Sequence, residues 1–328
     1  MQLATKLILY FERVRILEQT ILVRRSSLIM PSIRSEFVEK AWQRNADAIC
    51  LDLEDSVLEH QKEKARSAIR RQLPTAGKGG SDVLVRINSH RPMAAEDLDA
   101  SVYPGLSGII LPKVEDPEAV AWTEEEIGRL EKLRGLNPGS IDMTLLIESC
   151  LGYTRATEIL SYTRRAKTLM LGAEDFLLDL GITQSSIATL LPARTHLMIT
   201  ARAFGLESRG LLSSIADFSS PQHSFEAARK AYQFGYRGAT CVHPGQVAPY
   251  NQAFAPSEEE IKMAKAVLET YEQSKRNGKG SVALNGKMID GPIALRAQQL
   301  VSFSRAVEEM ELRKSRARNT VISSEAGI

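Results

Sequence analysis

Acidic residues follow the second apolar run of the chain, at the point where a buried strand would end. The stretch AICLDLED, residues 48–55, is apolar over its first four positions and then places Asp52, Glu54 and Asp55 within four positions. Surface strands alternate apolar and polar residues, whereas this pattern is typical of a strand that is buried on both faces and opens onto a polar site at its C-terminal end. Carboxylates are unfavourable there unless a cation or water solvates them. The pattern therefore predicts a functional site at this strand end.

Other apolar runs end in the same way. The residues that follow them are Arg86 and Asn88 after the third run, Lys113 and Glu115 after the fourth, Glu148 after the fifth, Glu174 and Asp175 after the sixth, and His243 after the eighth. One interpretation is that these are ordinary loop charges, since loops are polar. Because so many charged residues follow apolar runs, we favour a ring of polar side chains that converge on one site.

The acidic members of this ring indicate a hard, oxygen-rich metal site. Glu148 and Asp175 follow neighbouring runs, with mostly carboxylates around them and a single nearby histidine. Such donors suit Mg²⁺ or Mn²⁺, which keep several water ligands, better than Zn²⁺. Few direct protein ligands would leave coordination positions for substrate oxygens, so that the ion acts as a Lewis acid. We expect Glu54 and Asp55 to accept hydrogen bonds from metal-bound water.

Arg86 ends the run VLVRIN one predicted strand away from the acidic pair. A guanidinium can bind a substrate carboxylate through two parallel hydrogen bonds, which lysine would hold less directionally. The alternative is an ion pair between Arg86 and Glu54 or Asp55. The two arrangements are not exclusive, because the ion pair can form when no substrate is bound.

Short runs rich in β-branched residues alternate with longer segments of helical periodicity, which predicts parallel βαβ units. We place strands at 27–31, 48–54, 83–88, 108–114, 143–149, 168–175, 211–218 and 238–244. Eight such units in roughly 225 residues predict a TIM (β/α)8 barrel, in which the C-terminal ends of all strands face one mouth. A doubly wound open sheet is the alternative, but no predicted strand leads into a Gly-x-Gly-x-x-Gly turn.

The chain divides into three predicted segments. They are an N-terminal extension over residues 1–25, a barrel over 26–250, and a C-terminal helical segment over 251–328 that acts as a lid or an oligomer contact. The extension is basic and compatible with a helix, but Glu12, Glu18 and the scarcity of serine argue against an organelle transit sequence. We expect an extension helix or an upstream start codon.

The composition of the 328 residues is that of a soluble globular protein with a large core, since 43% are hydrophobic and 25% charged. A net charge of +2 argues against nucleic acid or an anionic membrane as the main partner. No apolar run reaches the roughly 18 to 20 residues that span a bilayer. Cys50, Cys150 and Cys241 lie in or beside predicted strands, so we expect core cysteines in a reducing, cytoplasmic compartment.

Nine sequence features in the same order resemble the HpcH/HpaI aldolase superfamily, specifically its branch of citrate lyase β subunits, malyl-CoA lyases and citramalyl-CoA lyases. They are RSSLIMP, LDLEDSV, Lys62 with Arg66, VRIN, LPKVE, LIES, GAEDFLLDLG, VHPGQV and NGKMIDGP, which extend from about Arg25 to Ala306. The resemblance implies a TIM barrel with an added C-terminal helical segment. It also implies an enzyme that makes or breaks a carbon–carbon bond between an acyl thioester enolate and a 2-oxo acid.

The resemblance assigns roles to individual residues. It makes Glu148 and Asp175 the Mg²⁺ ligands, in agreement with the argument above, and Arg86 the residue that binds the oxo-acid carboxylate. Asp290, in the motif GKMID, becomes the general acid/base, delivered by the C-terminal segment of a neighbouring subunit in a homotrimer or hexamer. Spacing alone would not single out Asp290, because an aspartate before Gly-Pro is usually a turn residue.

The resemblance also implies contacts with the CoA carrier. Arg34 and Lys40 fall where related lyases contact CoA, although Ile29 and Glu36 occupy positions that are often basic or aromatic. His243 would line the same mouth. It either donates as a neutral imidazole to the thioester or pantetheine, or makes a structural hydrogen bond.

The expected reaction is Mg²⁺-dependent cleavage of a 3-hydroxyacyl-CoA such as (3S)-citramalyl-CoA to acetyl-CoA and pyruvate. The alternatives are an L-malyl-CoA (β-methylmalyl-CoA) lyase or thioesterase, a citrate lyase β subunit, and a non-catalytic binding subunit of the same fold. The citrate lyase β subunit acts on an acyl-carrier-protein thioester in a larger complex, whereas the full GKMIDGP motif is more similar to that of a stand-alone CoA lyase.

Overall fold

The computed structural model describes residues 21–325, so that the predicted extension helix at the N-terminus lies outside the described residues. Among the described residues, one compact unit comprises 24–254 and 313–325, and the other comprises 21–23 and 255–312. Arg24 and Arg25, at the end of the predicted extension, are buried and belong to the larger unit.

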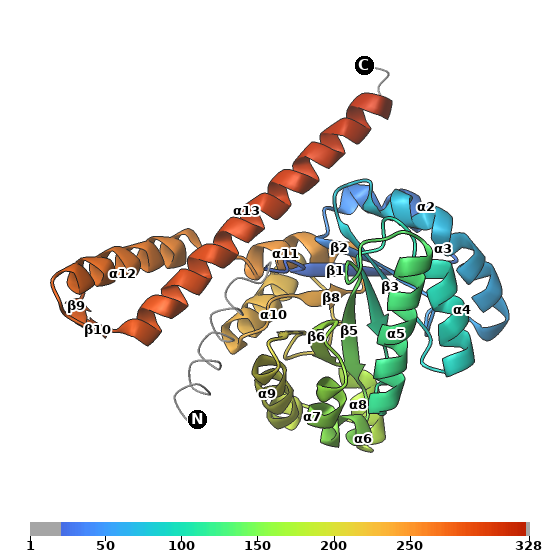
Figure 1. The fold of residues 1–328 in the computed structure, drawn as a ribbon, viewed down its shortest axis with the longest axis horizontal. Coiled ribbons are helices and arrows are strands. Elements are labelled where there is room, and N and C mark those ends of the chain that lie inside the picture. The colour runs from blue at the N-terminus through green and yellow to red at the C-terminus, as the bar shows by residue number, and fades with distance from the viewer. Residues whose placement is uncertain (1–20, 326–328) are drawn as a thin grey trace. The chain divides into compact units, whose positions relative to one another are not determined.

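Eight parallel strands form the sheet of the larger unit (Figure 1). They are β1 (Ser26–Pro31), β2 (Ala48–Asp52), β3 (Asp82–Arg86), β4 (Gly108–Leu111), β5 (Asp142–Ile147), β6 (Ala166–Leu171), β7 (Glu207–Arg209) and β8 (Ala239–Cys241). Each strand from β1 to β6 pairs with the next along the chain, and β8 pairs with β1. Gly210 N donates to Gly238 O at 2.9 Å and Arg237 N to Ser208 O at 3.2 Å, which joins the end of β7 to the start of β8. These bonds complete the ring, and the TIM-barrel prediction is confirmed.

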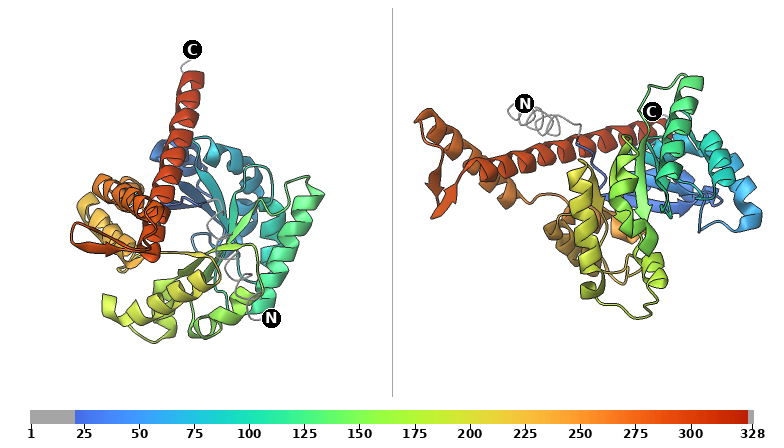
Figure 2. Two further views of the ribbon diagram at one scale, coloured as in Figure 1. Left: turned by 60° about the vertical axis from the view of Figure 1, so that its left-hand side comes forward. Right: turned by 60° about the horizontal axis from the view of Figure 1, so that its bottom comes forward.

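Helices surround the strands of this unit, as the left view of Figure 2 shows. The longer ones are α3 (Lys62–Gly77), α4 (Arg91–Ser101), α5 (Pro117–Leu133), α9 (Ile187–Ala203) and α10 (Pro221–Phe234). The shorter ones are α2 (Ser35–Glu39), η1 (Ala41–Arg44), η2 (Glu59–Gln61), α6 (Cys150–Thr154), α7 (Ala156–Ser161), α8 (Ala173–Asp179), η3 (Pro244–Gln246) and α11 (Val247–Ala253). The central strands are covered on both faces, which explains why they appear in the sequence as continuous apolar runs. Every residue of β2 is buried, Asp52 included.

The seventh strand lies outside the range predicted for it, so the prediction of a strand at 211–218 is wrong. β7 is the segment Glu-Ser-Arg at 207–209, which contains no apolar residue. Ser208 and Arg209 are nevertheless buried, and Arg209 forms an ion pair with Glu207 at 3.0 Å. β7 is short and its charged residues pair with each other, so it contains no hydrophobic run. The loop that follows contains apolar residues, and their pattern is that of a strand.

The smaller unit contains α12 (Glu258–Arg276), an antiparallel pair of β9 (Val282–Leu284) and β10 (Lys287–Ile289), and the first part of α13 (Gly291–Glu325). A β-hairpin therefore interrupts the segment that the sequence predicts to be helical. Its turn is Asn285–Gly286, with positive φ at both residues, which is the arrangement that favours Asn-Gly in two-residue hairpin turns. The core of this unit consists of Ala264, Val267, Ile289, Ala297 and Val301.

Two further expectations concern cysteines and membranes. Cys50 and Cys241 are buried, Cys150 is partly exposed at the start of α6, and all three are free thiols. Of the helices within residues 21–325, none combines the length and the apolar character needed to cross a membrane.

Candidate active site

Asp52 and Arg86 are register partners at the ends of β2 and β3. Asp52 accepts hydrogen bonds from Nε and Nη2 of Arg86 at 2.7 and 2.8 Å, and Nη1 lies 2.9 Å from a carboxylate oxygen of Glu54. Burial opposes ionisation of Asp52, but the hydrogen bonds and charge of Arg86 hold the pKa of this carboxyl below its ordinary value. Arg86 therefore forms an ion pair in this structure, as the alternative interpretation predicts. Its main partner is Asp52, a role that the sequence pattern does not assign to this residue.

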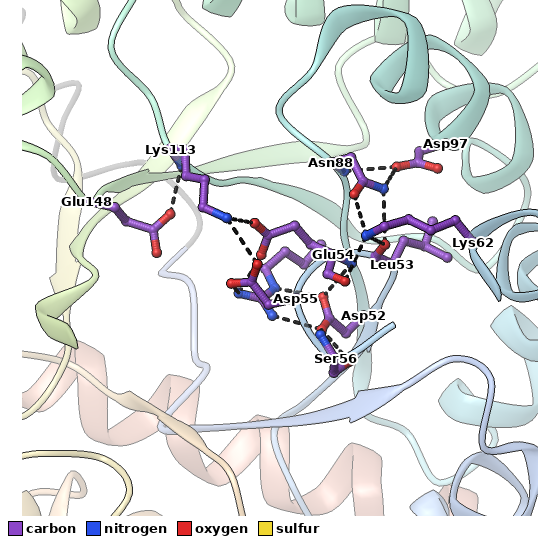
Figure 3. A network of polar contacts seen from close by, with 11 residues as sticks. Asp52, Leu53, Glu54, Asp55, Ser56, Lys62, Asn88, Asp97, Lys113 and Glu148 are labelled. Carbon is purple, nitrogen blue, oxygen red and sulfur yellow. Dashed lines mark hydrogen bonds and ion pairs between the residues drawn. The ribbon is translucent and has the colours of Figure 1, made fainter. Parts of the chain in front are cut away.

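Lys113 connects the acidic residues after β2 with Glu148 after β5 (Figure 3). Its φ of 51° lies in the left-handed region, which costs about 1–2 kcal/mol for a residue with a Cβ. In this conformation its backbone N–H donates to Glu148 Oε2 at 2.7 Å, and its ammonium binds Glu54 and, at 3.0 Å, Asp55. The contacts on both sides compensate for the backbone strain and fix three carboxylates relative to one another.

Lys62 fixes the backbone that carries these acidic residues. Its Nζ donates to the carbonyl oxygens of Leu53 and Glu54 at 3.0 and 2.9 Å and to Asn88 Oδ1 at 2.7 Å (Figure 3). All three acceptors lie just after β2 or β3, so that Lys62 holds the two strand ends together.

Glu148 and Asp175 lie at neighbouring strand ends. Glu148 is buried directly after β5, and half-buried Asp175 belongs to the first turn of α8 and not to a strand, because β6 already ends at Leu171. Burial, assisted by the negative charges of Glu54 and Asp175, raises the pKa of Glu148 to about 8. Gly172 makes room for this carboxylate, since a Cβ there would lie 2.5 Å from both Cγ and Oε1 of Glu148.

The charge balance of this cluster fits a divalent cation. The carboxylates of Asp52, Glu54, Asp55 and Glu148 contact two basic residues, Arg86 and Lys113, and Asp175 adds a fifth negative charge that acts on Glu148. The excess of negative charge contributes to the high pKa of Glu148. A bound cation would offset this excess charge. Across residues 21–325 no three His, Cys, Asp or Glu side chains converge as a metal site. Two carboxylates suffice for Mg²⁺, which usually keeps several waters.

Glu148 and Asp175 line two cavities. One has a volume of about 550 Å³ and is also lined by Asp52, Asp55 and Arg86 and by apolar residues that include Ile29, Met30, Ile110, Met170, Leu171 and Val242. The other has a volume of about 440 Å³, with Ser89, Lys113, Glu115, Ser149, Leu178 and Asp179 in its wall. Both volumes are within the range of small-molecule sites. The carboxylate pair is therefore accessible to a ligand in either cavity.

Comparison with known proteins agrees with this geometry. The HpcH/HpaI aldolase/citrate lyase family model matches residues 25–244, which is more than half of the chain. The chain belongs to this family. The citrate lyase subunit beta of Escherichia coli (strain K12) is 34% identical over 281 residues, which cover 85% of this chain and 92% of the relative. The mitochondrial citramalyl-CoA lyase of Rattus norvegicus is 29% identical over 300 residues, 87% of each chain.

A solved structure with the same fold is the protein CitE of Mycobacterium tuberculosis in complex with magnesium, acetoacetate and coenzyme A. It superposes with a TM-score of 0.66 at 28% sequence identity, over 85% of this chain and 97% of CitE. Together with the family match and the relatives above, it confirms the prediction of a carbon–carbon lyase in the HpcH/HpaI aldolase/citrate lyase family.

His243 of this family member follows β8 and stacks on Phe218, with ring centroids 4.7 Å apart and planes 9° apart. Its Nδ1 accepts a hydrogen bond from the N–H of Gly245 at 3.1 Å. The structural hydrogen bond that the sequence left open is thus present. His243 is exposed, and neither cavity has it in its lining. Its role toward the thioester or pantetheine stays a prediction.

Arg34 and Lys40 flank α2, the first helix of the HpcH/HpaI barrel. Both are exposed; Arg34 pairs with Glu36, and its guanidinium carbon lies 4.6 Å from the ring centroid of Phe37. The role of Arg34 and Lys40 in binding CoA stays a prediction.

Asp290 belongs to the smaller unit, between β10 and α13. Its Oδ1 accepts a hydrogen bond from the N–H of Ile293 at 3.2 Å, and its carbonyl oxygen accepts from Ala294 N at 2.9 Å, so that Asp290 caps the start of α13. Within residues 21–325, Oδ2 accepts no hydrogen bond. The family pattern's role for Asp290 as the general acid/base stays a prediction.

Proposed function

We propose that this protein is a divalent-metal-dependent lyase that cleaves a 3-hydroxyacyl-CoA, specifically (3S)-citramalyl-CoA, to acetyl-CoA and pyruvate. The observation that carries the proposal is the pair of Glu148 and Asp175, which lines both cavities within a cluster that has excess negative charge. Membership of the family and the similarity to a citramalyl-CoA lyase support it.

Glu148 and Asp175 would hold the ion, Mg²⁺ or Mn²⁺, which supplies Lewis acidity toward substrate oxygens when bound. The N–H of Lys113 orients Glu148, and Gly172 leaves space for its carboxylate. Glu54, tied to Lys113 and Arg86, would complete the polar surroundings. Little reorganisation of these side chains would be required on binding, which favours catalysis.

Arg86 would bind the carboxylate of the acid half of the substrate. Nε and Nη2 of Arg86 donate hydrogen bonds to Asp52, and Nη1 faces Glu54. Arg86 would therefore contact the substrate through Nη1. Hydrogen bonds from Arg86 to Asp52, and the charges of Asp52 and Glu54, raise the pKa of the guanidinium although burial opposes this, so that it remains cationic. The Asp52 contact would restrict the orientation of Arg86 and hence of the substrate.

Cleavage would begin with transfer of the substrate hydroxyl proton to Asp290, whose Oδ2 accepts no hydrogen bond within the described part of the chain. The C2–C3 bond then breaks, C3 becomes the ketone carbon of the oxo acid, and the bonding electron pair becomes the enolate of the acyl thioester. Asp290 returns the proton to C2, which gives acetyl-CoA. Atoms balance without water or an oxidant.

The assembly is part of the proposal. Residues 251–328 would act as a lid or an oligomer contact and bring Asp290 to the barrel mouth of a neighbouring subunit in a homotrimer or hexamer. Arg34 and Lys40 would supply local positive charge for the phosphates of CoA on a chain whose net charge is only +2.

Product analysis tests the function. The protein is incubated with (3S)-citramalyl-CoA and, separately, with L-malyl-CoA, each with Mg²⁺ or with EDTA, and acyl-CoA species and acids are quantified by mass spectrometry. Equimolar acetyl-CoA and pyruvate, formed from citramalyl-CoA only with Mg²⁺, is the expected result. Free CoA with an intact hydroxy acid would identify a thioesterase, and no turnover of either substrate would contradict the proposal.

A further inference from the structure

The cavity of about 550 Å³ extends below the strand ends, into the interior of the barrel. Successive residues of a strand point to opposite sides, so that residues two positions apart lie in successive layers of the barrel interior, about 6–7 Å apart. Pairs of this kind line the cavity: Ser27 with Ile29, Cys50 with Asp52, and Leu146 with Glu148. The cavity therefore reaches at least one layer beneath the carboxylates.

The layer directly beneath Glu148 and Arg86 is apolar. Leu146 lies two positions before Glu148, and Met170 on β6 is its register partner. Ile110 on β4 is the register partner of Arg86. All three apolar side chains line the cavity. Leu146 and Met170 are only partly buried although they lie in central strands, because they face this cavity.

Charge is confined to other parts of the cavity wall. Apart from the residues of the carboxylate cluster and Arg86, the charged residues that line the cavity within the described chain are Glu174 on α8 and Arg194 on α9. An apolar cluster of Ala48, Cys50, Leu84 and Ile110, with Ile29 packed against it, fills the barrel interior. Such surroundings favour an alkyl group, which leaves water on binding, over a polar group that would find no partner there.

We propose that Ile110, Leu146 and Met170 form a subsite for the alkyl substituent at C3 of the 3-hydroxyacyl group, and that this subsite accepts chains longer than the methyl group of pyruvate. The inference rests on the proposed function. Arg86 would bind the carboxylate of the acid half, and its oxygens would lie beside Glu148, which leaves the alkyl substituent to contact the apolar layer. One layer of the barrel has room for an ethyl or propyl chain, so that 2-oxobutanoate and 2-oxopentanoate become products.

The pantetheine arm of CoA is the competing occupant of this apolar layer, because parts of the arm are apolar. The arm is the same in every substrate. If it occupied the layer, filling the layer would weaken binding of CoA, and the affinity for the free acids would not depend on the length of their chains. The dependence of affinity on chain length therefore separates the two occupants.

The test is calorimetric titration of pyruvate, 2-oxobutanoate and 2-oxopentanoate, with Mg²⁺ present, and of free CoA, into the wild type, Leu146→Phe and Leu133→Phe. Leu133 is an exposed leucine at the end of α5 and serves as the matched control. In the wild type and Leu133→Phe the affinity should rise about fourfold for each added methylene group, as burial of such a group provides. Leu146→Phe fills the layer, so the ratio of 2-oxopentanoate to pyruvate affinity should fall to one or below.

Three results would overturn the proposal: no rise with chain length in the wild type, an unchanged ratio in Leu146→Phe, or a loss of CoA affinity in Leu146→Phe that equals or exceeds the loss for 2-oxopentanoate. If Leu146→Phe does not fold, Met170→Phe fills the same layer and replaces it, and the wild-type series needs no variant.

The titration is independent of turnover. A preference for longer chains, in a protein that does not cleave acyl-CoA, would refute the proposed function and leave the subsite intact. Cleavage of (3S)-citramalyl-CoA without a preference for longer chains would refute the subsite and leave the proposed function intact.

Discussion

Asp52 and Arg86 face each other on neighbouring parallel strands, joined by hydrogen bonds of 2.7 and 2.8 Å. Asp52 is fully buried, and 15% of the Arg86 side chain is exposed, so the aspartate holds the guanidinium from the interior of the barrel. Arg86 is therefore fixed in orientation before any substrate binds.

Replacing this aspartate should affect both stability and activity. We expect Asp52→Asn to lower the free energy of unfolding by about 3 kcal/mol, the lower end of the range for breaking a buried pair, because Glu54 still faces Arg86. Turnover should fall because Arg86 loses its fixed orientation. Urea unfolding and steady-state kinetics measure the two effects.

Asp55→Asn, which removes a half-exposed carboxylate 3.7 Å from Arg86, is the control and should change stability by at most about 1 kcal/mol. Equal losses of stability in the two variants would contradict the argument.

Gly172→Ala should weaken metal binding without unfolding the barrel. The new methyl group would lie 2.5 Å from Cγ and Oε1 of Glu148, so the carboxylate must move. We expect Mn²⁺ affinity, measured by electron paramagnetic resonance titration, to fall by about tenfold or more, as for other changes around metal ligands. In Gly128→Ala, on α5, the nearest atom would be 3.6 Å away, and Mn²⁺ affinity should not change. Wild-type affinity in Gly172→Ala would show that Glu148 does not hold the ion.

Mixing subunits tests whether Asp290 acts on a neighbour. Asp290→Asn and Asp175→Ala should each be inactive, because one lacks the proposed acid/base and the other a proposed metal ligand. Mixed oligomers should recover part of the activity, since an intact barrel can then receive an intact Asp290 from another chain. Subunit exchange is verified by native mass spectrometry. If exchange occurs and no activity returns, Asp290 acts within its own chain or has only the helix-capping role.

The opposite end of the barrel should lose stability in acid. Fully buried Asp47 accepts hydrogen bonds from Arg25 Nε at 2.7 Å and Lys314 Nζ at 2.6 Å. Burial opposes its ionisation, but these cations hold its pKa below the ordinary value. A depressed folded-state pKa gives stability that is present above the unfolded-state pKa of about 4 and is lost as pH falls through the folded-state value.

Asp47→Asn measures this contribution. The free energy of unfolding should be lower than in the wild type by about 3–5 kcal/mol at pH 7, and the difference should shrink below about pH 4. Chemical denaturation at a series of pH values gives both curves. Glu272→Ala, which removes an exposed ion pair on α12, should change stability by at most about 1 kcal/mol at every pH. A difference between wild type and Asp47→Asn that does not depend on pH would refute the ionic origin of the stability.

Much of the fold could be predicted because buried parallel strands leave apolar runs in the sequence, and polar residues follow where those strands end. Glu148 and Arg86 were placed at strand ends for this reason. β7 was misplaced because its residues at 207–209 pair their own charges and show no apolar run. The sequence predicts that Asp175 belongs to the site but places it in a strand. It lies in α8, because β6 ends earlier than the sequence indicates.

The contacts within the site were less predictable. Asp52 and Arg86 lie 34 positions apart, and only the strand register brings them together. The left-handed conformation of Lys113 depends on tertiary contacts, since lysine has no local preference for it.

The central claim is that Glu148 and Asp175 hold a divalent ion required for carbon–carbon cleavage. The most direct measurement is pyruvate and acetyl-CoA release from (3S)-citramalyl-CoA by the wild type, Asp175→Ala and the surface variant Glu226→Ala, with Mg²⁺ and with EDTA. We expect turnover by the wild type and Glu226→Ala only with Mg²⁺, and a loss of at least about a thousandfold in folded Asp175→Ala, since the ion contributes several kcal/mol. Undiminished turnover by Asp175→Ala, or by the wild type in EDTA, would contradict the claim.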